Sequence, residues 1–127
     1  MQEVVVLGVG MHRFGKTGDA IVGNKSVTEL CRAAVDMALK DAGVSWRQIE
    51  AVSAASSRFS GGKGWGLNGN DIVEDMGSTG IPVYNLSAGC AAGGNAFNIG
   101  YSLVAGGIHD MVLVVGGEVM PKGMIQT

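Results

Sequence analysis

The sequence predicts an α/β fold, a single three-layer domain with a mostly parallel central sheet and helices on both of its faces. Three observations lead to this prediction. Candidate strands and helices alternate along the chain in the order β, α, β, short α, β, α, β. The clearest candidate strands are uninterrupted apolar runs, which is the pattern of strands buried on both faces of a parallel sheet. The length of 127 residues fits one domain, because a domain usually contains about 100 to 200 residues.

The first predicted elements are a strand, a loop and a helix. The β-branched run Val4–Val9 predicts a buried strand, because it is apolar and bounded by glycine. Residues 11–25 predict a long loop, since their glycines recur without helical periodicity. A capping box then starts a helix, with Glu29 three residues after Ser26. Apolar residues recur at helical spacing until Gly43, a typical helix stop.

The middle of the chain predicts a second strand, a loop, a short helix and a third strand. Residues 49–55 (IEAVSAA) form the weaker strand candidate. A glycine-rich loop is expected over residues 56–70, and a short helical stretch over residues 71–76. The segment Pro82–Leu86 (PVYNL) then predicts another strand.

The last two elements are a helix and a strand. An Ala- and Gly-rich helix is expected from about Cys90 to Ala105, where a pair of glycines ends it. Asp110–Gly116 (DMVLVVG) is the clearest buried strand in the chain. Strands that alternate with helices are usually joined by right-handed crossovers into a parallel sheet, with the last helix as a core helix between layers.

Composition and charge exclude several classes of protein. The chain is 46% hydrophobic and 16% charged, which excludes intrinsic disorder and indicates that a partner or further domain covers part of the surface. The net charge of −2, without charge blocks, argues against nucleic acid binding. No apolar stretch of about 20 residues predicts a membrane span, and no basic segment predicts a secretory signal. We therefore expect a cytoplasmic protein whose two cysteines are free thiols, and no metal site.

The segment most suggestive of chemistry is Asn85–Ala96 (NLSAGCAAGGNA). Its cysteine, Cys90, lies at the junction of a predicted buried strand and a helix of small residues. A helix N-terminus presents unpaired N–H groups and a partial positive charge, which stabilise a thiolate or an oxyanion. Such a strand-turn-helix elbow exposes a nucleophile at the carboxyl edge of a sheet. The alternative is that Cys90 is a small buried hydrophobe.

Other residues in this chain suggest weaker roles. Cys31 lies inside the first helix and is assigned to packing, whereas Asn85 is expected to support the elbow through side-chain hydrogen bonds. His12 and His109 are the two histidines, and either can be a solvated loop residue. His12 is the better candidate base for Cys90, because its loop leaves the carboxyl end of the first predicted strand. Glu118, after the last strand, is expected to pair with a loop.

The opening glycines do not predict a nucleotide site. Gly8 and Gly10 begin like a G-x-G fingerprint directly after a strand. Arg13 stands where the third glycine belongs, and no helix starts there. The two glycines are therefore interpreted as turn residues.

Two motifs resemble the N-terminal half of a thiolase: LSAGCAAGG, and the later run DMVLVVGGEVM. The opening VVVLGVGMHRFGK resembles the thiolases related to sterol carrier protein, including the lipid-transfer-protein type, more closely than the biosynthetic thiolases. The similarity covers essentially the whole chain. It implies that residues 1–127 are a thiolase-like N-terminal domain and that a second, C-terminal half is absent.

The resemblance also implies an activity. Cys90 takes the position of the nucleophile that accepts an acyl group from an acyl-CoA, and its own N–H is one oxyanion donor. The reaction is then cleavage of a 3-oxoacyl-CoA or the reverse Claisen condensation, in lipid metabolism. Coenzyme A and acyl-CoA are substrates, so no permanently bound cofactor is expected and no CoA-binding residue is assigned. The resemblance further implies a homodimer that meets around Pro82–Leu86.

Two other functions remain open. In thiolases the second half supplies an activating histidine, a second cysteine and a further oxyanion donor, and nothing in this chain matches these motifs. Full activity would then need a second half, from the same protein or from a partner chain. A non-catalytic scaffold or partner subunit with this half-fold is one alternative. A relative that cleaves aldol adducts of sterol side chains, without an acyl-cysteine, is the other.

Overall fold

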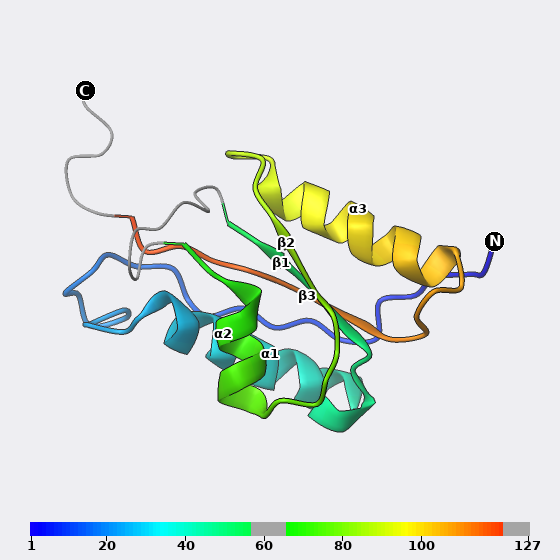
Figure 1. The fold of residues 1–127 in the computed structure, drawn as a ribbon. Helices are drawn as coiled ribbons and strands as arrows, with labels where there is room; N and C mark the ends of the chain where they lie inside the picture. The colour runs from blue at the N-terminus through cyan, green and yellow to red at the C-terminus, as the bar shows by residue number, and fades with distance from the viewer. Residues whose placement is uncertain (57–65, 121–127) are drawn as a thin grey trace.

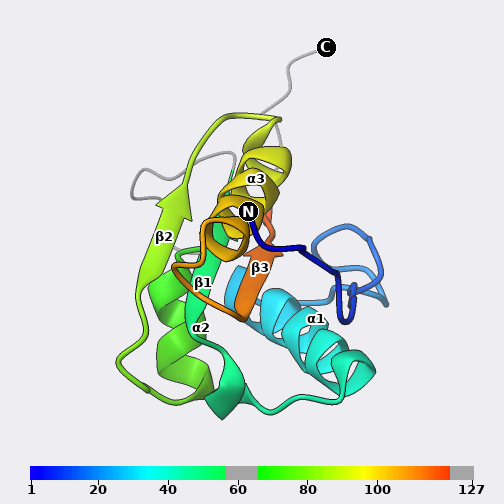
Figure 2. The ribbon, with the colours of Figure 1, turned by 90° about the vertical axis from the view of Figure 1, so that its right-hand side faces the viewer.

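The computed structural model of this chain describes residues 1–56 and 66–120. Three parallel strands form its sheet: β1 (Ala51–Ala55), β2 (Val83–Leu86) and β3 (Val112–Gly116). Their order is β2-β1-β3, so β1 is central and has a ladder partner on each edge (Figures 1 and 2). The predicted parallel sheet is confirmed.

Helices cover both faces of this sheet, as the sequence predicts. The helices α1 (Val27–Ala42) and α2 (Gly69–Met76) lie on one face, and α3 (Ala92–Ala105) lies on the other (Figure 1). A short 3-10 helix at Trp46–Gln48 leads from α1 to β1. Of the glycine-rich loop predicted at 56–70, residues 57–65 lie outside the described part of the chain.

Local sequence signals fix the ends of α1. The Ser26 hydroxyl accepts a hydrogen bond from the Glu29 N–H at 3.1 Å, and the Glu29 carboxylate accepts one from the Ser26 N–H at 2.7 Å. Gly43 ends the helix in the left-handed region, with φ of +68°. The predicted capping box and the predicted stop are both confirmed.

The central strand β1 is the most buried element. All five of its residues are buried, although the sequence predicts only a weak strand there. Their small side chains let a helix pack closely on each face of the sheet. The main core lies between the sheet and the helices α1 and α2. Its buried members include Val27, Val35, Ile49, Val52, Leu67, Ile72, Leu113 and Val115.

The N-terminal run Val4–Val9 is not a strand, so this prediction is wrong. Both edges of β1 are occupied by β2 and β3, and the run forms no ladder with the described strands. It lies instead against α1, where the Val9 N–H donates to the Asp41 carboxylate at 2.9 Å. A Cβ at Gly8 would lie 2.5 Å from the Ala42 nitrogen, so close backbone contact requires glycine there. Together with α1, α3 and β3, the run lines an apolar cavity of about 420 Å³.

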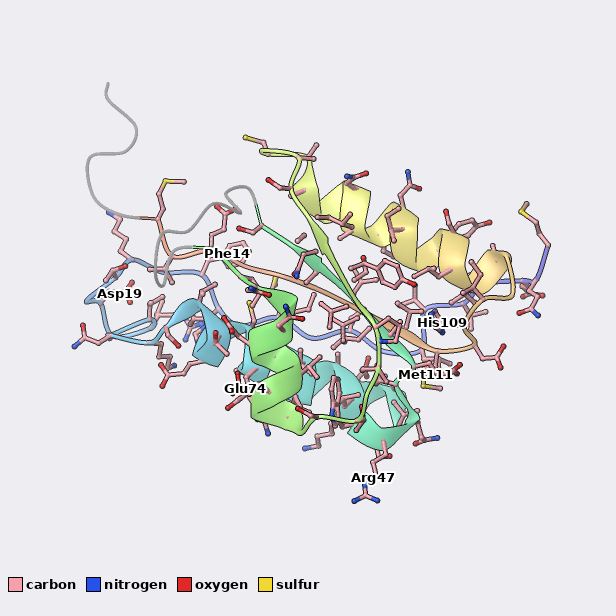
Figure 3. The ribbon with its side chains drawn as sticks, viewed as in Figure 1. Phe14, Asp19, Arg47, Glu74, His109 and Met111 are labelled. Atoms are coloured by element: carbon pink, nitrogen blue, oxygen red, sulfur yellow. The ribbon has the colours of Figure 1, made fainter. Side chains whose placement is uncertain are left out.

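The loop over residues 11–25 is present as predicted and is organised around Asp19 (Figure 3). The Asp19 carboxylate accepts hydrogen bonds from the N–H groups of Lys16, Ile21 and Val22 at 2.6 to 2.8 Å. The bonds from Val22 and Lys16 hold the pKa of Asp19 below its ordinary value.

Among residues 1–56 and 66–120, no helix has both the length and the apolar character that crossing a bilayer requires.

Candidate active site

The candidate site lies in the turn between β2 and α3. Cys90 is exposed in this turn, which begins after Leu86. The N–H of Ala91 donates to the Ala88 carbonyl at 3.1 Å, and the N–H of Ala92 donates to the Gly89 carbonyl at 3.2 Å. The helix α3 starts at Ala92, two residues later than the predicted start at about Cys90, so Cys90 precedes the helix. The prediction of a tight turn at the carboxyl edge of the sheet is confirmed.

The first turn of α3 can receive an anion. Its N-cap, Ala91, has no side chain able to accept a hydrogen bond, and no side-chain cap is formed within the described structure. The first turn also contains no acidic residue. The first N–H groups of a helix need acceptors from outside the helix, and they carry the positive end of its dipole. Negative charge that develops beside this helix start would therefore be stabilised.

Gly89 sets the shape of the turn, since its φ of +54° lies in the left-handed region. Replacing Gly89 with alanine is expected to lower the free energy of unfolding by about 1 kcal/mol, because a Cβ is strained in that conformation. Urea denaturation monitored by circular dichroism measures this effect. Gly89→Asn is the control, because asparagine tolerates the left-handed region, and it should retain most of the stability. Equal losses in the two variants would contradict this explanation.

Two contacts hold α3 on the sheet. Ser53 of β1 is fully buried, and its hydroxyl donates to the Ala96 carbonyl of α3 at 2.8 Å. A Cβ at Gly100 would lie 2.6 Å from the Val114 side chain, so α3 approaches β3 closely at that glycine. Buried small residues line the inner face of α3, whereas its outer face is exposed, with Phe97 52% accessible. The predicted core helix is therefore covered on one face only in this structure.

Cys31 is buried, as predicted for a packing residue. Its sulfur lies directly against Gly117, just beyond the end of β3. Burial raises the pKa of the Cys31 thiol to about 12. This thiol is therefore protonated at neutral pH and has no solvent access, whereas Cys90 is exposed.

Iodoacetamide is expected to distinguish the two thiols in the folded protein. At pH 8, Cys90 should be alkylated at least about 100-fold faster than Cys31, because only the thiolate reacts and Cys31 neither ionises nor reaches solvent. Peptide mass spectrometry measures the two rates. In 8 M urea the rates should converge, because unfolding exposes both thiols. Comparable rates in the native protein would contradict the burial of Cys31.

In the structure, both ring nitrogens of His12 contact groups other than Cys90. The Nδ1 atom of His12 lies 2.7 Å from the Arg13 carbonyl, so it carries the proton and donates to that oxygen. The Nε2 atom lies 3.0 Å from the Lys25 ammonium, from which it accepts. Both ring nitrogens are thus engaged within the loop of residues 11–25. The sequence interpretation of His12 as the better base gains no support from this geometry.

His109 lies at the opposite end of the sheet. It precedes β3, beside Met111 (Figure 3), whereas Cys90 follows the carboxyl end of β2. The strands are parallel, and five residues of strand span about 16 Å, so His109 cannot reach Cys90. The Nε2 atom of His109 is buried without a hydrogen-bond partner in the described part of the chain.

Asn85 supports a different element from the one that the sequence predicts. Its Oδ1 accepts from the Gly69 N–H at 2.8 Å, and its Nδ2 donates to the Asn68 side chain at 3.2 Å. These bonds reach the N-terminus of α2, not the backbone of the elbow.

Glu118 forms an isolated antiparallel bridge with Gly66, so it does pair with a loop. Within the described ranges, no group of three or more acidic, histidine or cysteine side chains could hold a metal ion.

Two solved structures share the fold of this chain. Over 72% of this chain, 3-oxoacyl-[acyl-carrier-protein] synthase III from Aquifex aeolicus superposes with a TM-score of 0.61 at 19% identity. The OleA protein of Xanthomonas campestris superposes over 76% of this chain with a TM-score of 0.62 at 20% identity. In both cases 29% of the other chain is covered, and the likeness concerns the fold alone.

Relatives in sequence are more similar. Sterol carrier protein 2 of Bos taurus is 35% identical over 97% of this chain, and acetyl-CoA acetyltransferase of Methanothermobacter thermautotrophicus is 32% identical over 94%. The chain spans only 21% and 30% of the length of these two relatives. The family model for the thiolase N-terminal domain matches residues 4–126, and this chain therefore belongs to the thiolase N-terminal domain family.

Proposed function

We propose that this chain supplies the nucleophilic cysteine, Cys90, of a thiolase-type acyl-CoA acyltransferase. The observation that carries the proposal is the exposure of Cys90 in the turn before α3, whose first N–H groups lack a side-chain cap in the described structure. Membership of the thiolase N-terminal domain family supports the same activity. So does the similarity to a protein named acetyl-CoA acetyltransferase.

The proposed chemistry uses an acyl-cysteine. In condensation, the Cys90 thiolate forms a bond to the thioester carbonyl carbon and produces a tetrahedral oxyanion. The oxyanion collapses, the bond to the CoA sulfur breaks, and CoA leaves as a thiolate that takes up a proton. The acyl group then passes to the α-carbanion of a second acyl-CoA. In cleavage, the thiolate attacks the 3-oxo carbon, the bond between carbons 2 and 3 breaks, and the leaving acyl-CoA carbanion takes up a proton at carbon 2. The thiolate of free CoA then attacks the acyl-cysteine, which gives a new acyl-CoA and restores the Cys90 thiolate.

The chain's own part in this reaction is electrostatic. The N–H of Cys90 and the N–H groups that follow Ala92 in the first turn of α3 are the donors proposed for the oxyanion, since the Ala92 N–H already donates to the Gly89 carbonyl. Because such donors are fixed by backbone geometry, they need no rearrangement as charge develops. The closed turn at Ala88 and Ala91 and the anchored α3 supply that fixed geometry.

A second half of the enzyme is part of the proposal. Neither His12 nor His109 is placed to remove the proton of Cys90, so the base must come from further residues of the protein or from a partner chain. Coenzyme A and its acyl thioesters are the proposed substrates, with no permanently bound cofactor. A cytoplasmic location fits two cysteines that form no disulfide.

A homodimer through β2 is also proposed. This strand lies at the edge of the sheet, and its residues Val83–Leu86 are only half-buried. Pairing of two such edges would bury their free backbone groups. Sedimentation equilibrium should then give twice the monomer mass, and Val83→Pro, which removes an N–H donor on the outer edge of β2, should shift the equilibrium toward the monomer. A monomer at all concentrations would refute this part of the proposal.

The deciding experiment is intact-mass and peptide analysis of the protein after incubation with acetyl-CoA. We expect an increase of one acetyl group, located on Cys90. Cys90→Ala should remove the adduct, whereas Cys31→Ala, the matched control at the buried thiol, should retain it. The absence of an adduct on the folded wild-type chain would refute acyl transfer by this chain alone, leaving either a fragment that needs its second half or a scaffold. Retro-aldol activity that survives Cys90→Ala would instead favour the aldolase alternative.

A further inference from the structure

The elbow, residues Ser87–Ala91 between β2 and α3, has few attachments to the rest of the molecule. Its own hydrogen bonds, from Ala91 to Ala88 and from Ala92 to Gly89, stay within the turn. On the helix side it is held because Ala92 is buried against β1 and Leu86. On the strand side, the last ladder bond runs from the Ser56 N–H to the Leu86 carbonyl at 3.2 Å. The strand that carries the elbow is therefore short and has a single partner strand.

The side chain of Asn85 attaches the β2 side of the elbow to a second element, α2. In the described structure, no other side chain from residues 85–91 forms a tertiary hydrogen bond. Asn85 pairs with Ala54 of β1 through the backbone, and its side chain reaches out of the ladder to α2. Both of its amide atoms are used, one as an acceptor for Gly69 and one as a donor to Asn68.

The partners of Asn85 are themselves fixed. Gly69 is buried at the start of α2, where a Cβ would lie 2.7 Å from the side chains of both Ala54 and Val83. Asn68 is the N-cap of α2, and its Oδ1 also accepts from the Asn70 N–H at 3.0 Å. The helix start that receives Asn85 is thus pressed on the sheet and capped. It provides a firm point on the face of the sheet opposite α3.

We propose that Asn85 is a positioning residue for Cys90, because its side chain connects the C-terminal end of β2 to the N-terminus of α2. This connection fixes the end of the strand that the elbow follows. The inference rests on the proposed function of Cys90. Asn85 touches neither substrate nor sulfur in this role. Its effect is to hold the elbow at a fixed position relative to the N–H groups of α3, so that the thiolate and the oxyanion donors stay aligned.

Amide hydrogen exchange followed by mass spectrometry tests the positioning directly. In Asn85→Ala, exchange of the amides of residues 86–91 should accelerate at least about tenfold, while the amides of β1 and β3 should change less than about twofold. Asn85→Asp keeps the acceptor for Gly69 and loses the donor to Asn68, so about threefold acceleration is expected. This milder variant keeps the test valid if the alanine variant does not fold.

Two asparagine variants serve as matched controls. Asn68→Asp keeps both acceptor bonds of the N-cap and should leave exchange in the elbow within about twofold of wild type. Asn98→Ala removes an exposed asparagine of α3 whose side chain forms no hydrogen bond in the described structure, and it should have no effect. Unchanged elbow exchange in both Asn85 variants, or equal acceleration in the elbow and in β1, would overturn the inference.

Acylation separates this inference from the proposed function. In single-turnover reactions with acetyl-CoA, Asn85→Ala should lower the maximal acylation rate about tenfold and leave the half-saturating concentration within about twofold. A wild-type protein that carries its second half and is still not acylated would refute the proposed function, while the exchange experiment would still decide whether Asn85 fixes the elbow. Acylation at the wild-type rate in a variant with a loosened elbow would overturn the positioning role.

Discussion

Replacing Ile72 with alanine is expected to lower the free energy of unfolding by about 3 kcal/mol. Ile72 is fully buried on α2, within the main core cluster that contains Val52 and Leu113. Truncation removes the transfer free energy of three carbons and leaves a cavity that the closely packed β1 strand cannot fill. Urea denaturation at 25 °C, followed by far-ultraviolet circular dichroism, measures the loss.

Ile108 provides the matched control. It lies in the turn after α3 and is 65% exposed. The same substitution, Ile108→Ala, should change stability by less than about 0.5 kcal/mol, because no core contact is lost. A loss at position 72 no larger than the loss at position 108 would contradict the packing of α2 on the sheet.

Replacing Gly69 with alanine should also destabilise the protein, by about 2 kcal/mol. The new Cβ would lie 2.7 Å from the Ala54 and Val83 side chains and 3.1 Å from the Asn85 amide oxygen. The helix must move away from the sheet to admit this methyl group, and the movement weakens the bond between Asn85 and the Gly69 N–H. Thermal and urea unfolding curves of the folded variant measure the cost.

Gly93→Ala is the control that separates the effect of the position from the effect of replacing glycine with alanine. Gly93 lies in α3, and nothing lies within 4 Å of the place where its Cβ would stand. Alanine is a better helix former than glycine, so Gly93→Ala should stabilise the protein by about 0.5 kcal/mol. Opposite signs for the two variants are therefore expected. Destabilisation of similar size in both would show that the contact at Gly69 is not limiting.

The sequence predicts best where the determining interactions are local. The limits of α1 follow from Ser26, Glu29 and Gly43, whose side chains and backbone bond to residues within the same helix end. The turn before α3 is predictable for the same reason, because glycine and small residues between an apolar strand and a helix specify it. The exposed position of Cys90 follows from that local pattern.

The sequence predicts less well where tertiary pairing decides. The run Val4–Val9 has a typical strand composition, but a strand also needs a ladder partner, and this run lies against α1 without pairing with the outer edge of β2 or β3. The weak candidate over residues 49–55 becomes the centre of the sheet for the converse reason. Its alanines and Ser53 have low strand propensity, and burial between two layers of helices outweighs that propensity.

The sequence also does not predict the hydrogen-bond partners of the polar side chains. A serine in an apolar strand signals a buried hydrogen bond, but only the structure identifies its acceptor as the Ala96 carbonyl. The sequence predicts that Asn85 bonds within its own turn, whereas its side chain bonds to α2. The ring nitrogens of His12 form hydrogen bonds with Lys25 and the Arg13 carbonyl. Such pairings depend on which loops meet in space, which no spacing along the chain encodes.

The central place of β1 has a consequence for how the chain folds during synthesis. Its ladder with β3 joins Ala51 to Val112, about 60 positions apart. At a translation rate of about 5 to 20 residues per second, β1 leaves the ribosome about 3 to 12 seconds before β3. Helix α1 can form from local contacts in that time, whereas one edge of an apolar strand remains unpaired. The nascent chain should therefore be most prone to aggregation, and most dependent on chaperones, in the interval between these two strands.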